Sequence, residues 1–271
     1  MERRFRNRGG YLGERIDLQE VWAGCEGAGR KHGWRQETIP VDGRLSLLAW
    51  IRSQGVSGDV SRLRRVYISA GIHGDEPAGP VAAWRLMERN RWPEGLDLWV
   101  VPCLNPMGLA QNRREGPDGF DLNRDYRHLR SPEVRAHVAW LERQPDFGVS
   151  FCLHEDWEAA GFYLYELNPH GMPSVAETLL ETVAQVCPLD LSPMIEGRPA
   201  QGGLIRPVVD PELRPEWPEA FWLVYRGRAM VSYTLEAPSD YPLEVRVRAL
   251  VTGMEAALQA WWVRLSDMVK P

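Results

Sequence analysis

The sequence has few cysteines and no pattern that would pair them. Its four cysteines are far apart and form no C-x-x-C motif. Thiols spaced in this way are typical of reduced, buried residues, and they argue against a disulfide framework. Cys152 stands two residues before His154 and would share its face of a strand, but a small core residue is the favoured interpretation.

Long hydrophobic runs and an excess of positive charge are also missing. No apolar segment approaches the length of a membrane span, and the first residues lack the apolar core and cleavage site of a secretory signal. We therefore expect a cytoplasmic protein without a membrane partner. The net charge of -5 argues against nucleic acid as the main partner, and the cluster of Arg3, Arg4, Arg6 and Arg8 is interpreted as a solvated tail.

The composition predicts one folded domain. The chain has 271 residues, of which 44% are hydrophobic and 25% charged, and it shows no internal repeat or low-complexity tract. This suits a single large core, so we assign residues 1–271 to one domain with a flexible basic tail at 1–10. Residues 188–218 carry seven prolines and little periodicity, which predicts an excursion over the surface that could cover a site.

Apolar patterns along the chain predict alternating strands and helices. Alternating or continuous apolar runs indicate strands, and apolar residues three or four apart indicate helices. Strands are expected at 45–52, 65–70, 96–102, 148–153, 161–166 and 230–236, and helices at 18–23, 77–87, 131–141, 174–186 and 240–265, with a turn at 55–58. The order predicts an α/β fold, a mixed, mostly parallel central sheet flanked by helices.

One long segment has almost no apolar periodicity. Residues 105–130 are rich in glycine, asparagine, arginine and aspartate. Loops of this length within a domain are usually functional, so we expect this one to contribute to a site.

A histidine and a glutamate follow the strand expected at 65–70. His73 and Glu76 lie where that strand gives way to a helix, and glycines at positions 71, 74 and 79 permit a tight path of the backbone. The loop can therefore turn both side chains toward one point. Taken alone, a histidine and a glutamate three residues apart are only a weak indication of metal ligands.

Two further strands end in polar residues. His154 closes the strand at 148–153, and Glu236 closes the strand at 230–236. Open α/β sheets place their sites beyond the carboxyl ends of the strands, so these residues are expected near His73 and Glu76. Two histidines and one glutamate, with a fourth position left to water, are the ligand set of a hydrolytic zinc site.

Six motifs occur in an order that resembles the zinc carboxypeptidases and the related succinylglutamate desuccinylase/aspartoacylase branch. They are Gly71-Ile-His-Gly-Asp-Glu76, Asn105-Pro-Met-Gly108, Asn112-Arg113, Gly119-Phe-Asp-Leu-Asn-Arg124, His154 and Thr234-Leu-Glu236. The match runs from about Val66 to the carboxyl end. No single motif is decisive, but six in order are hard to attribute to chance.

The resemblance implies one zinc ion and a general base. His73, Glu76 and His154 would hold the Zn²⁺, which would activate a water molecule. Glu236 would take the water's proton and pass it to the leaving amine, which calls for a partly desolvated pocket and a raised pKa. An alternative for Glu236 is a structural role, as a cap of neighbouring backbone or a partner of an arginine.

The resemblance also implies roles for residues of the long loop. Arg113 would polarise the scissile carbonyl, and Asn123 with Arg124 would hold a carboxylate of the substrate. Arg124 could instead pair with Asp121 on the surface. Arg114, next to Arg113, is expected to face the solvent.

The residues after the third ligand depart from the family pattern. Carboxypeptidases usually continue with small hydroxyl residues, whereas Glu155, Asp156, Trp157 and Glu158 follow here. We expect Glu155 and Asp156 to favour a substrate with a free amine or another cation. The mobile tyrosine of the carboxypeptidases is not singled out among Tyr163, Tyr165, Tyr225 and Tyr233.

The expected function is that of a zinc metallocarboxypeptidase, which hydrolyses an amide bond next to a free carboxylate in a short or modified peptide. A close alternative is an N-acyl amino acid deacylase of the succinylglutamate desuccinylase/aspartoacylase type. Those deacylases usually carry a further β-rich domain after the catalytic glutamate, whereas one long helix is expected after Glu236; the turn at 105–108 also favours the peptidase. A non-catalytic metal-binding module would have no use for Glu236 and Arg113.

Overall fold

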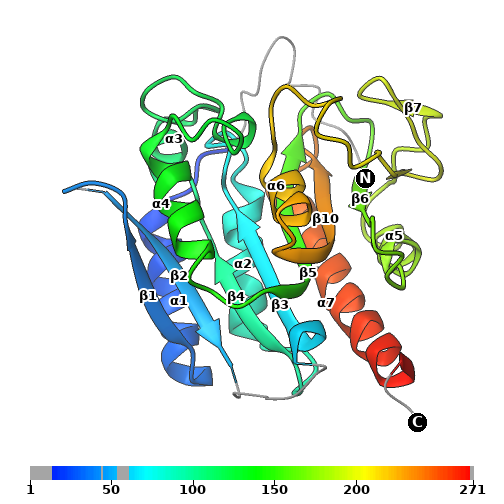
Figure 1. The fold of residues 1–271 in the computed structure, drawn as a ribbon, viewed down its shortest axis with the longest axis horizontal. Helices are drawn as coiled ribbons and strands as arrows, with labels where there is room; N and C mark the ends of the chain where they lie inside the picture. Colours follow the sequence, from blue (N-terminus) through cyan, green and yellow to red (C-terminus); the bar gives the residue numbers. More distant parts are fainter. Residues whose placement is uncertain (1–13, 44, 54–60, 269–271) are drawn as a thin grey trace.

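An eight-stranded sheet runs through the computed structural model, which describes residues 14–43, 45–53 and 61–268 (Figure 1). In pairing order its strands are β1 (Arg35–Pro40), β2 (Ser46–Arg52), β4 (Asp97–Val101), β3 (Arg65–Ala70), β5 (Phe147–Asp156), β10 (Ala229–Pro238), β6 (Tyr163–Leu167) and β9 (Leu204–Ile205). The four central strands β4, β3, β5 and β10 are parallel, and β1, β2 and β6 pair antiparallel with their neighbours toward the centre. The predicted α/β fold with a mixed, mostly parallel sheet is confirmed.

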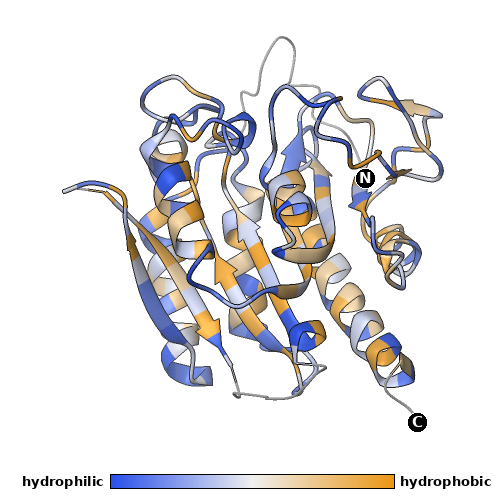
Figure 2. Cartoon of the chain, in the orientation of Figure 1, coloured by the Kyte–Doolittle hydropathy of each residue, from blue (hydrophilic) through white to orange (hydrophobic). Residues whose placement is uncertain are grey.

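Helices cover both faces of the sheet. One face packs against α1 (Leu18–His32), α2 (Ala78–Arg89) and α7 (Leu243–Met268), with α5 (Ala176–Val183) beside α7. The other face packs against α4 (Pro132–Leu141) and α6 (Glu219–Tyr225), which lie in front of the sheet in Figure 1. Figure 2 shows hydrophobic residues along the strands between these layers, whereas the outer strand β1 is largely hydrophilic.

Side chains of β5 alternate between the two layers, as the pleat of a strand requires. Val149, Phe151 and Leu153 belong to the core shared with α2 and α7. Cys152 faces the other way and contacts the cluster built on α6. The expected small core role of Cys152 is confirmed, because its exposure is 1%. The same alternation decides, at the end of the strand, which side chains can reach a site.

Several boundaries differ from those expected. The helix expected at 18–23 continues to His32, and the long polar segment contains a short helix α3 (Pro106–Gln111) and a 3-10 turn η2 (Leu122–Arg124) in place of a continuous loop. A second 3-10 turn, η1 (Arg62–Arg64), precedes β3. These pieces depend on side-chain caps and long-range contacts, which leave no apolar period in the sequence. The tail at 1–10 and the turn at 55–58 lie outside the described residues.

The proline-rich segment at 188–218 is more than a surface excursion. It forms a small hairpin of β7 (Met194–Ile195) and β8 (Arg198–Pro199), and its β9 pairs with β6 at the edge of the main sheet. Several of its residues border the cavity described below, so its expected position over a site agrees with the structure. Within the described residues, no helix combines the length and apolar character needed to cross a membrane.

Candidate metal centre and its cavity

The loop after β3 requires glycine at position 74. A Cβ atom on Gly74 would lie 2.0 Å from the backbone carbon of Gly108 and 2.4 Å from the carbonyl oxygen of Arg113. Since real Cβ atoms do not approach other atoms so closely, only glycine lets the loop pack against the segment after β4. The loop then enters α2 at Pro77, which precedes the first helical residue. This path fixes where His73 and Glu76 project.

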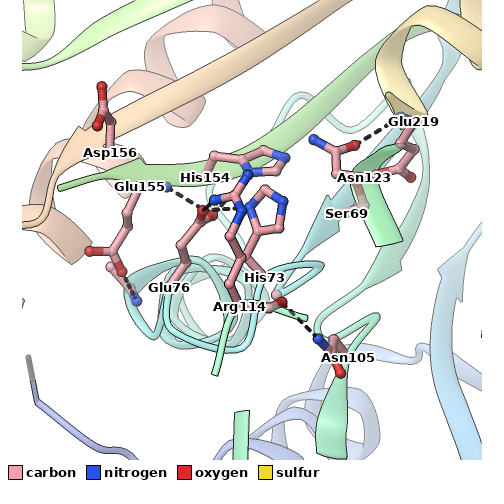
Figure 3. A network of polar contacts seen from close by, with 12 residues as sticks. Ser69, His73, Glu76, Asn105, Arg114, Asn123, His154, Glu155, Asp156 and Glu219 are labelled. Carbon is pink, nitrogen blue, oxygen red and sulfur yellow. Dashed lines mark hydrogen bonds and ion pairs between the residues drawn. The ribbon is translucent and has the colours of Figure 1, made fainter. Parts of the chain in front are cut away.

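Asn105 joins the two loops. Its side-chain oxygen accepts a hydrogen bond from Gly108 N at 2.8 Å and so caps α3. Its side-chain nitrogen donates to the carbonyl oxygen of Arg114 at 3.2 Å, and that oxygen also accepts from Gly74 N at 3.3 Å (Figure 3). The Asn-Pro-Met-Gly motif therefore holds Arg114 beside the loop of His73 and Glu76.

Two histidines converge on one carboxylate. His73 Nδ1 lies 2.5 Å from Glu76 Oε1, and His154 Nδ1 lies 2.9 Å from Glu76 Oε2 (Figure 3). One ligand atom from each of the three residues falls within 4.8 Å of the others, and all three residues are buried. Two imidazole nitrogens and a carboxylate oxygen brought to one point are a donor set that suits Zn²⁺. The residues present therefore fit the ion that the sequence led us to expect.

The charges of this cluster support a bound cation. Burial favours the neutral form of His73, but the Glu76 carboxylate and hydrogen bonds to Asp121 and Glu76 outweigh it and raise the His73 pKa to about 9. Burial would raise the pKa of Glu76, yet His73 and His154 outweigh burial and lower it. The carboxylate thus remains ionised between two imidazoles. Such an arrangement holds a proton or, equally, a metal cation at the centre of the cluster.

Asp121 fixes the far side of the His73 ring. Asp121 Oδ1 lies 3.1 Å from His73 Nε2, and Asp121 Oδ2 accepts a hydrogen bond from Arg114 Nε at 3.0 Å. A carboxylate on the second nitrogen is the usual way in which a protein sets the tautomer and orientation of a metal-binding histidine. The sequence offered Asp121 only as a surface partner of Arg124, because nothing local shows that the loop folds back onto His73.

Arg114, and not Arg113, faces the cluster. Arg114 Nη1 lies 3.5 Å from Glu76 Oε1, and the side chain borders the cavity. The Arg113 side chain is 41% exposed, donates to the carbonyl of Gly116 at 2.5 Å and lies 3.4 Å from Glu115. The expectation that Arg114 faces the solvent is therefore wrong, and Arg114 is the arginine of this pair that borders the cavity.

Asn123 and Arg124 border the cavity from the 3-10 turn η2, and Asn123 lies on the other side of the histidines from Asp156 (Figure 3). The Asn123 side-chain oxygen accepts a hydrogen bond from Glu219 N at 2.9 Å, so the amide nitrogen points toward the histidines (Figure 3). The Arg124 guanidinium is half-exposed, donates to the Asn123 carbonyl at 3.0 Å and reaches Glu216 only at 3.8 Å. Both residues have polar groups available to a ligand in the cavity.

Glu155 borders the cavity, but its carboxylate does not point into it. Its side chain is 0% exposed, accepts from Ala78 N at 2.5 Å and from Ser239 Oγ at 3.1 Å, and pairs with Arg246. The expected contact of Glu155 with a substrate cation is therefore wrong, because the strand pleat sends this side chain into the α2–α7 layer (Figure 3). Asp156 points the other way, borders the cavity and accepts from Tyr163 OH at 2.9 Å.

Glu236 borders the cavity beside the third histidine. The parallel register of β5 and β10 pairs Glu236 directly with His154. Burial, the negative charges of Glu76 and Asp156, and a smaller opposing effect of Arg114 leave the Glu236 pKa well above its usual range. This agrees with the raised pKa expected from the sequence. Of the four tyrosines considered, only Tyr165 borders the cavity; its hydroxyl donates to Glu196 at 2.5 Å.

The cavity itself has room for a small ligand. Its volume is about 430 Å³. It extends from the His73–Glu76–His154 cluster to the segment at 207–216, and its wall includes two further arginines and three further glutamates: Arg198, Arg214, Glu158, Glu196 and Glu216. Cavities of this size accept ligands of a few hundred daltons, and charged groups of both signs favour a ligand that is itself charged.

Sequence comparisons identify relatives of part of the chain. Residues 62–167 match the model of the succinylglutamate desuccinylase/aspartoacylase catalytic domain. Carboxypeptidase SOL1 of Arabidopsis thaliana is 32% identical over 112 residues, which are 34% of this chain and 23% of the relative. Carboxypeptidase 2 of Trichophyton rubrum is 34% identical over 91 residues, 31% of this chain and 17% of the relative. The matches therefore span less than a quarter of each relative.

Structural comparisons extend over nearly the whole chain. A candidate metallopeptidase from Shewanella amazonensis superposes with a TM-score of 0.76 at 21% identity, over 92% of this chain and 98% of that one. A metallo-carboxypeptidase from Pseudomonas aeruginosa, solved in complex with (2-guanidinoethylmercapto)succinic acid, gives 0.66 at 18% identity, over 93% and 70% of the two chains. At these identities the superpositions show a shared fold.

Proposed function

We propose that the chain is a zinc-dependent carboxypeptidase of the zinc carboxypeptidase family, including its succinylglutamate desuccinylase/aspartoacylase branch, because its matching domain model, its curated relatives and its structural neighbours come from that family. Its substrate would be a short or modified peptide, cleaved at an amide bond next to a free carboxylate. The observation that carries the proposal is the convergence of His73, Glu76 and His154 beside Glu236, at the edge of a cavity that Arg114 and Arg124 also border.

Three residues would hold the metal. His73, Glu76 and His154 offer their ligand atoms within 4.8 Å of one another, and Asp121 orients the His73 ring. A bound zinc ion would act as a Lewis acid, which polarises a carbonyl oxygen and lowers the pKa of a water molecule toward neutral pH. The remaining work of binding, orientation and proton transfer falls to the side chains around it.

Glu236 is the proposed proton carrier. It faces the cavity from the strand next to that of His154, and its raised pKa makes it a stronger base, which can take a proton from water and return it to the leaving amine. Arg114 is the proposed partner of the developing oxyanion, because its guanidinium stands 3.5 Å from Glu76 and borders the same cavity.

Asn123 and Arg124 are the proposed carboxylate clamp. An amide N–H and a guanidinium fork, placed next to each other on η2, match the two oxygens of a terminal carboxylate. Asp156 would then receive a cationic group of the substrate. The guanidinium and succinate groups in the name of the ligand bound to the Pseudomonas aeruginosa relative have this combination of charges.

A deacylase is the second candidate. The matching model over residues 62–167 describes the catalytic domain of succinylglutamate desuccinylase and aspartoacylase, which favours an acyl amino acid as substrate. Both reactions cleave an amide next to a carboxylate with the same groups, so the site geometry is compatible with either. The curated relatives with carboxypeptidase names favour the peptidase.

A substrate panel separates these candidates. Zinc-loaded, metal-analysed protein would be incubated with dipeptides, cell-wall peptides and N-acyl amino acids, and released amine would be measured. We expect hydrolysis of peptides, and a fall of about 100- to 10,000-fold in kcat for Glu236→Gln with the zinc content unchanged. Glu158→Gln is the matched control, since Glu158 also borders the cavity but lies outside the proposed proton path.

Each outcome of the panel has a distinct meaning. Hydrolysis of acyl amino acids alone would establish the deacylase and overturn the peptidase. Retention of zinc without hydrolysis of any compound class would favour a non-catalytic metal-binding module. Wild-type turnover by Glu236→Gln would remove Glu236 from the mechanism.

A further inference from the structure

We propose that Glu155 and Arg246 form a positioning pair that holds the metal-binding side chains at their working separation. The inference rests on the proposed metal site, but it concerns two residues that contact neither the proposed ion nor the substrate cavity with their charged groups. Their partners are the backbone and side chains of the segments that carry the ligands.

Glu155 is bonded to both ligand-bearing segments. Its backbone N–H donates to Glu76 Oε2 at 3.1 Å, while its own carboxylate accepts from the N–H of Ala78, the first residue of α2, at 2.5 Å. It also follows His154 directly in β5. Glu155 therefore links the strand of His154 to the loop of His73 and Glu76, once at the Glu76 side chain and once at the start of α2.

The same carboxylate reaches the segment that follows Glu236. Ser239 Oγ donates to Glu155 Oε2 at 3.1 Å, and Ser239 N donates to the carbonyl of Asp156. Ser239 lies just beyond the carboxyl end of β10. Glu155 is thus the point at which the three strand ends that carry the proposed ligands and the proposed base are joined.

Arg246 supplies the charge that this arrangement needs. It lies in α7, 91 positions after Glu155 in the sequence, and its side chain is 0% exposed. One guanidinium nitrogen pairs with Glu155 Oε2, and another donates to Glu14 Oε2 at 2.5 Å. Without this cation, the Glu155 carboxylate would be buried close to the negatively charged Glu76.

A buried ion pair in this position is expected to act on geometry. Burying two charges is costly and such pairs often add little net stability, so a purely stabilising role is a poor explanation. The contacts instead fix two hydrogen bonds. The N–H of Glu155 orients the Glu76 carboxylate, and the N–H of Ala78 holds the start of α2 against the Glu155 carboxylate. Loss of either charge should therefore be measurable as a change in metal affinity.

The test is a measurement of metal binding in the full chain. Zinc dissociation constants would be obtained by competition with a chromophoric chelator, and the Co²⁺-loaded protein would be examined by its visible absorption spectrum. For Glu155→Gln and Arg246→Met we expect zinc affinity to fall roughly 10- to 100-fold, the usual range for outer partners of a metal site, and the Co²⁺ spectrum to change. Ser239→Ala, which removes one neutral donor to Glu155, should weaken zinc binding by roughly 2- to 10-fold.

Arg228→Met provides the matched control. Arg228, which directly precedes β10, pairs with Asp146 and donates to the carbonyls of Leu141 and Gln144 at the end of α4 and in the turn before β5, so it lies at the edge of the sheet opposite the ligands. It should lower the melting temperature of the zinc-free protein while leaving zinc affinity within about twofold of wild type, because it is remote from the ligands. The comparison separates loss of stability from loss of positioning.

The outcomes are distinct. Unchanged zinc affinity and Co²⁺ spectra in Glu155→Gln and Arg246→Met would overturn the positioning role, even if both variants melt at lower temperature. Should those two fail to fold, Ser239→Ala decides the question, and a wild-type result for it would overturn the proposal. Absence of zinc binding in the wild-type protein would overturn the proposed function together with this inference.

Discussion

Two clusters in this molecule combine buried histidine with glutamate, but only one of them opens on the cavity. The open cluster is formed by His73, Glu76 and His154 with Asp121 and Arg114. The closed cluster lies beneath α6, where His137 is bonded to Tyr67 and Tyr126, and Tyr67 and Ser69 both donate to Glu219.

The partners of the histidine nitrogens separate the two clusters. Both nitrogens of His73 face carboxylates, which raise its pKa to about 9 in spite of burial. Both nitrogens of His137 face phenol oxygens at 2.8 and 2.7 Å, and burial lowers its pKa to about 3. Tyr67 gives its only hydroxyl hydrogen to Glu219, so His137 donates through Nε2 and accepts from Tyr126 through Nδ1.

The difference shows that buried histidine and glutamate do not by themselves make a metal site. In the closed cluster the groups described here satisfy one another, and Glu219 uses its backbone N–H to hold Asn123 in place. In the open cluster, negative charge and ring nitrogens converge where a ligand can enter. The closed cluster supports the cavity wall by holding Asn123 in place, and the open cluster is the proposed catalytic site.

The largest expected effect comes from removing the positive charge of Arg114 from the open cluster. Arg114→Gln should lower kcat by about 100- to 1,000-fold on whichever substrate the panel identifies, because a fixed positive group at the oxyanion is lost. Arg113→Gln, one position away and outside the cavity, should stay within about twofold of wild type. Steady-state kinetics of the two variants measure this contrast, and the reverse order of effects would restore the assignment made from the sequence.

The second prediction concerns the pH dependence of the closed cluster. Burial raises the Glu219 pKa to about 7, although hydrogen bonds from Ser69 and Tyr67 oppose the shift. Because the folded pKa exceeds the ordinary value of 4.5, the stability associated with the neutral acid is present below about pH 4.5 and is lost as the pH rises to about 7. The difference in unfolding free energy between wild type and Glu219→Gln should change across that window by about 3 kcal/mol, with the variant gaining relative to wild type at higher pH.

Urea unfolding of both proteins at several pH values measures this change. Subtracting the two plots of unfolding free energy against pH removes the contribution of the open cluster, which titrates in both proteins. A difference that is independent of pH would show that folding does not shift the Glu219 pKa and would weaken the contrast between the clusters.

The smallest expected effect is at Asp156. Asp156→Asn should raise KM by roughly 2- to 5-fold for substrates with a cationic group, the range of a partly solvated ion pair, and leave KM for neutral analogues unchanged. Equal effects on cationic and neutral substrates would remove Asp156 from substrate recognition. The exposure of this residue to the cavity, in contrast with the sealed Glu155, is the structural reason for expecting any effect.

Strand ends could be predicted from the sequence because they depend on local patterns. The runs before His73, His154 and Glu236 indicated strands, and the rule for parallel sheets then predicted one shared edge, which the structure shows. The alternation of a strand also assigns Glu155 to the face opposite His154, so the direction of its side chain follows from the sequence once β5 continues to Asp156.

Other features depend on contacts that the sequence does not display. The sequence does not distinguish the adjacent Arg113 and Arg114. In the structure, Asn112 turns the chain with a φ of 53°, and hydrogen bonds from Gly74 and Asn105 hold the Arg114 carbonyl. These contacts determine which arginine faces Glu76. Asp121 reaches His73 across 48 positions, and Arg246 reaches Glu155 across 91. Such long-range polar pairs leave no period or motif by which they could be found.

A zinc titration of three proteins tests the central claim most directly. Isothermal calorimetry with metal-free wild type, Glu76→Gln and Glu219→Gln compares the open cluster with the closed one by the same substitution. We predict one zinc ion per chain in the wild type and in Glu219→Gln, and loss of that binding in Glu76→Gln. Absence of zinc binding in the wild type, or equal binding by Glu76→Gln, would contradict the account.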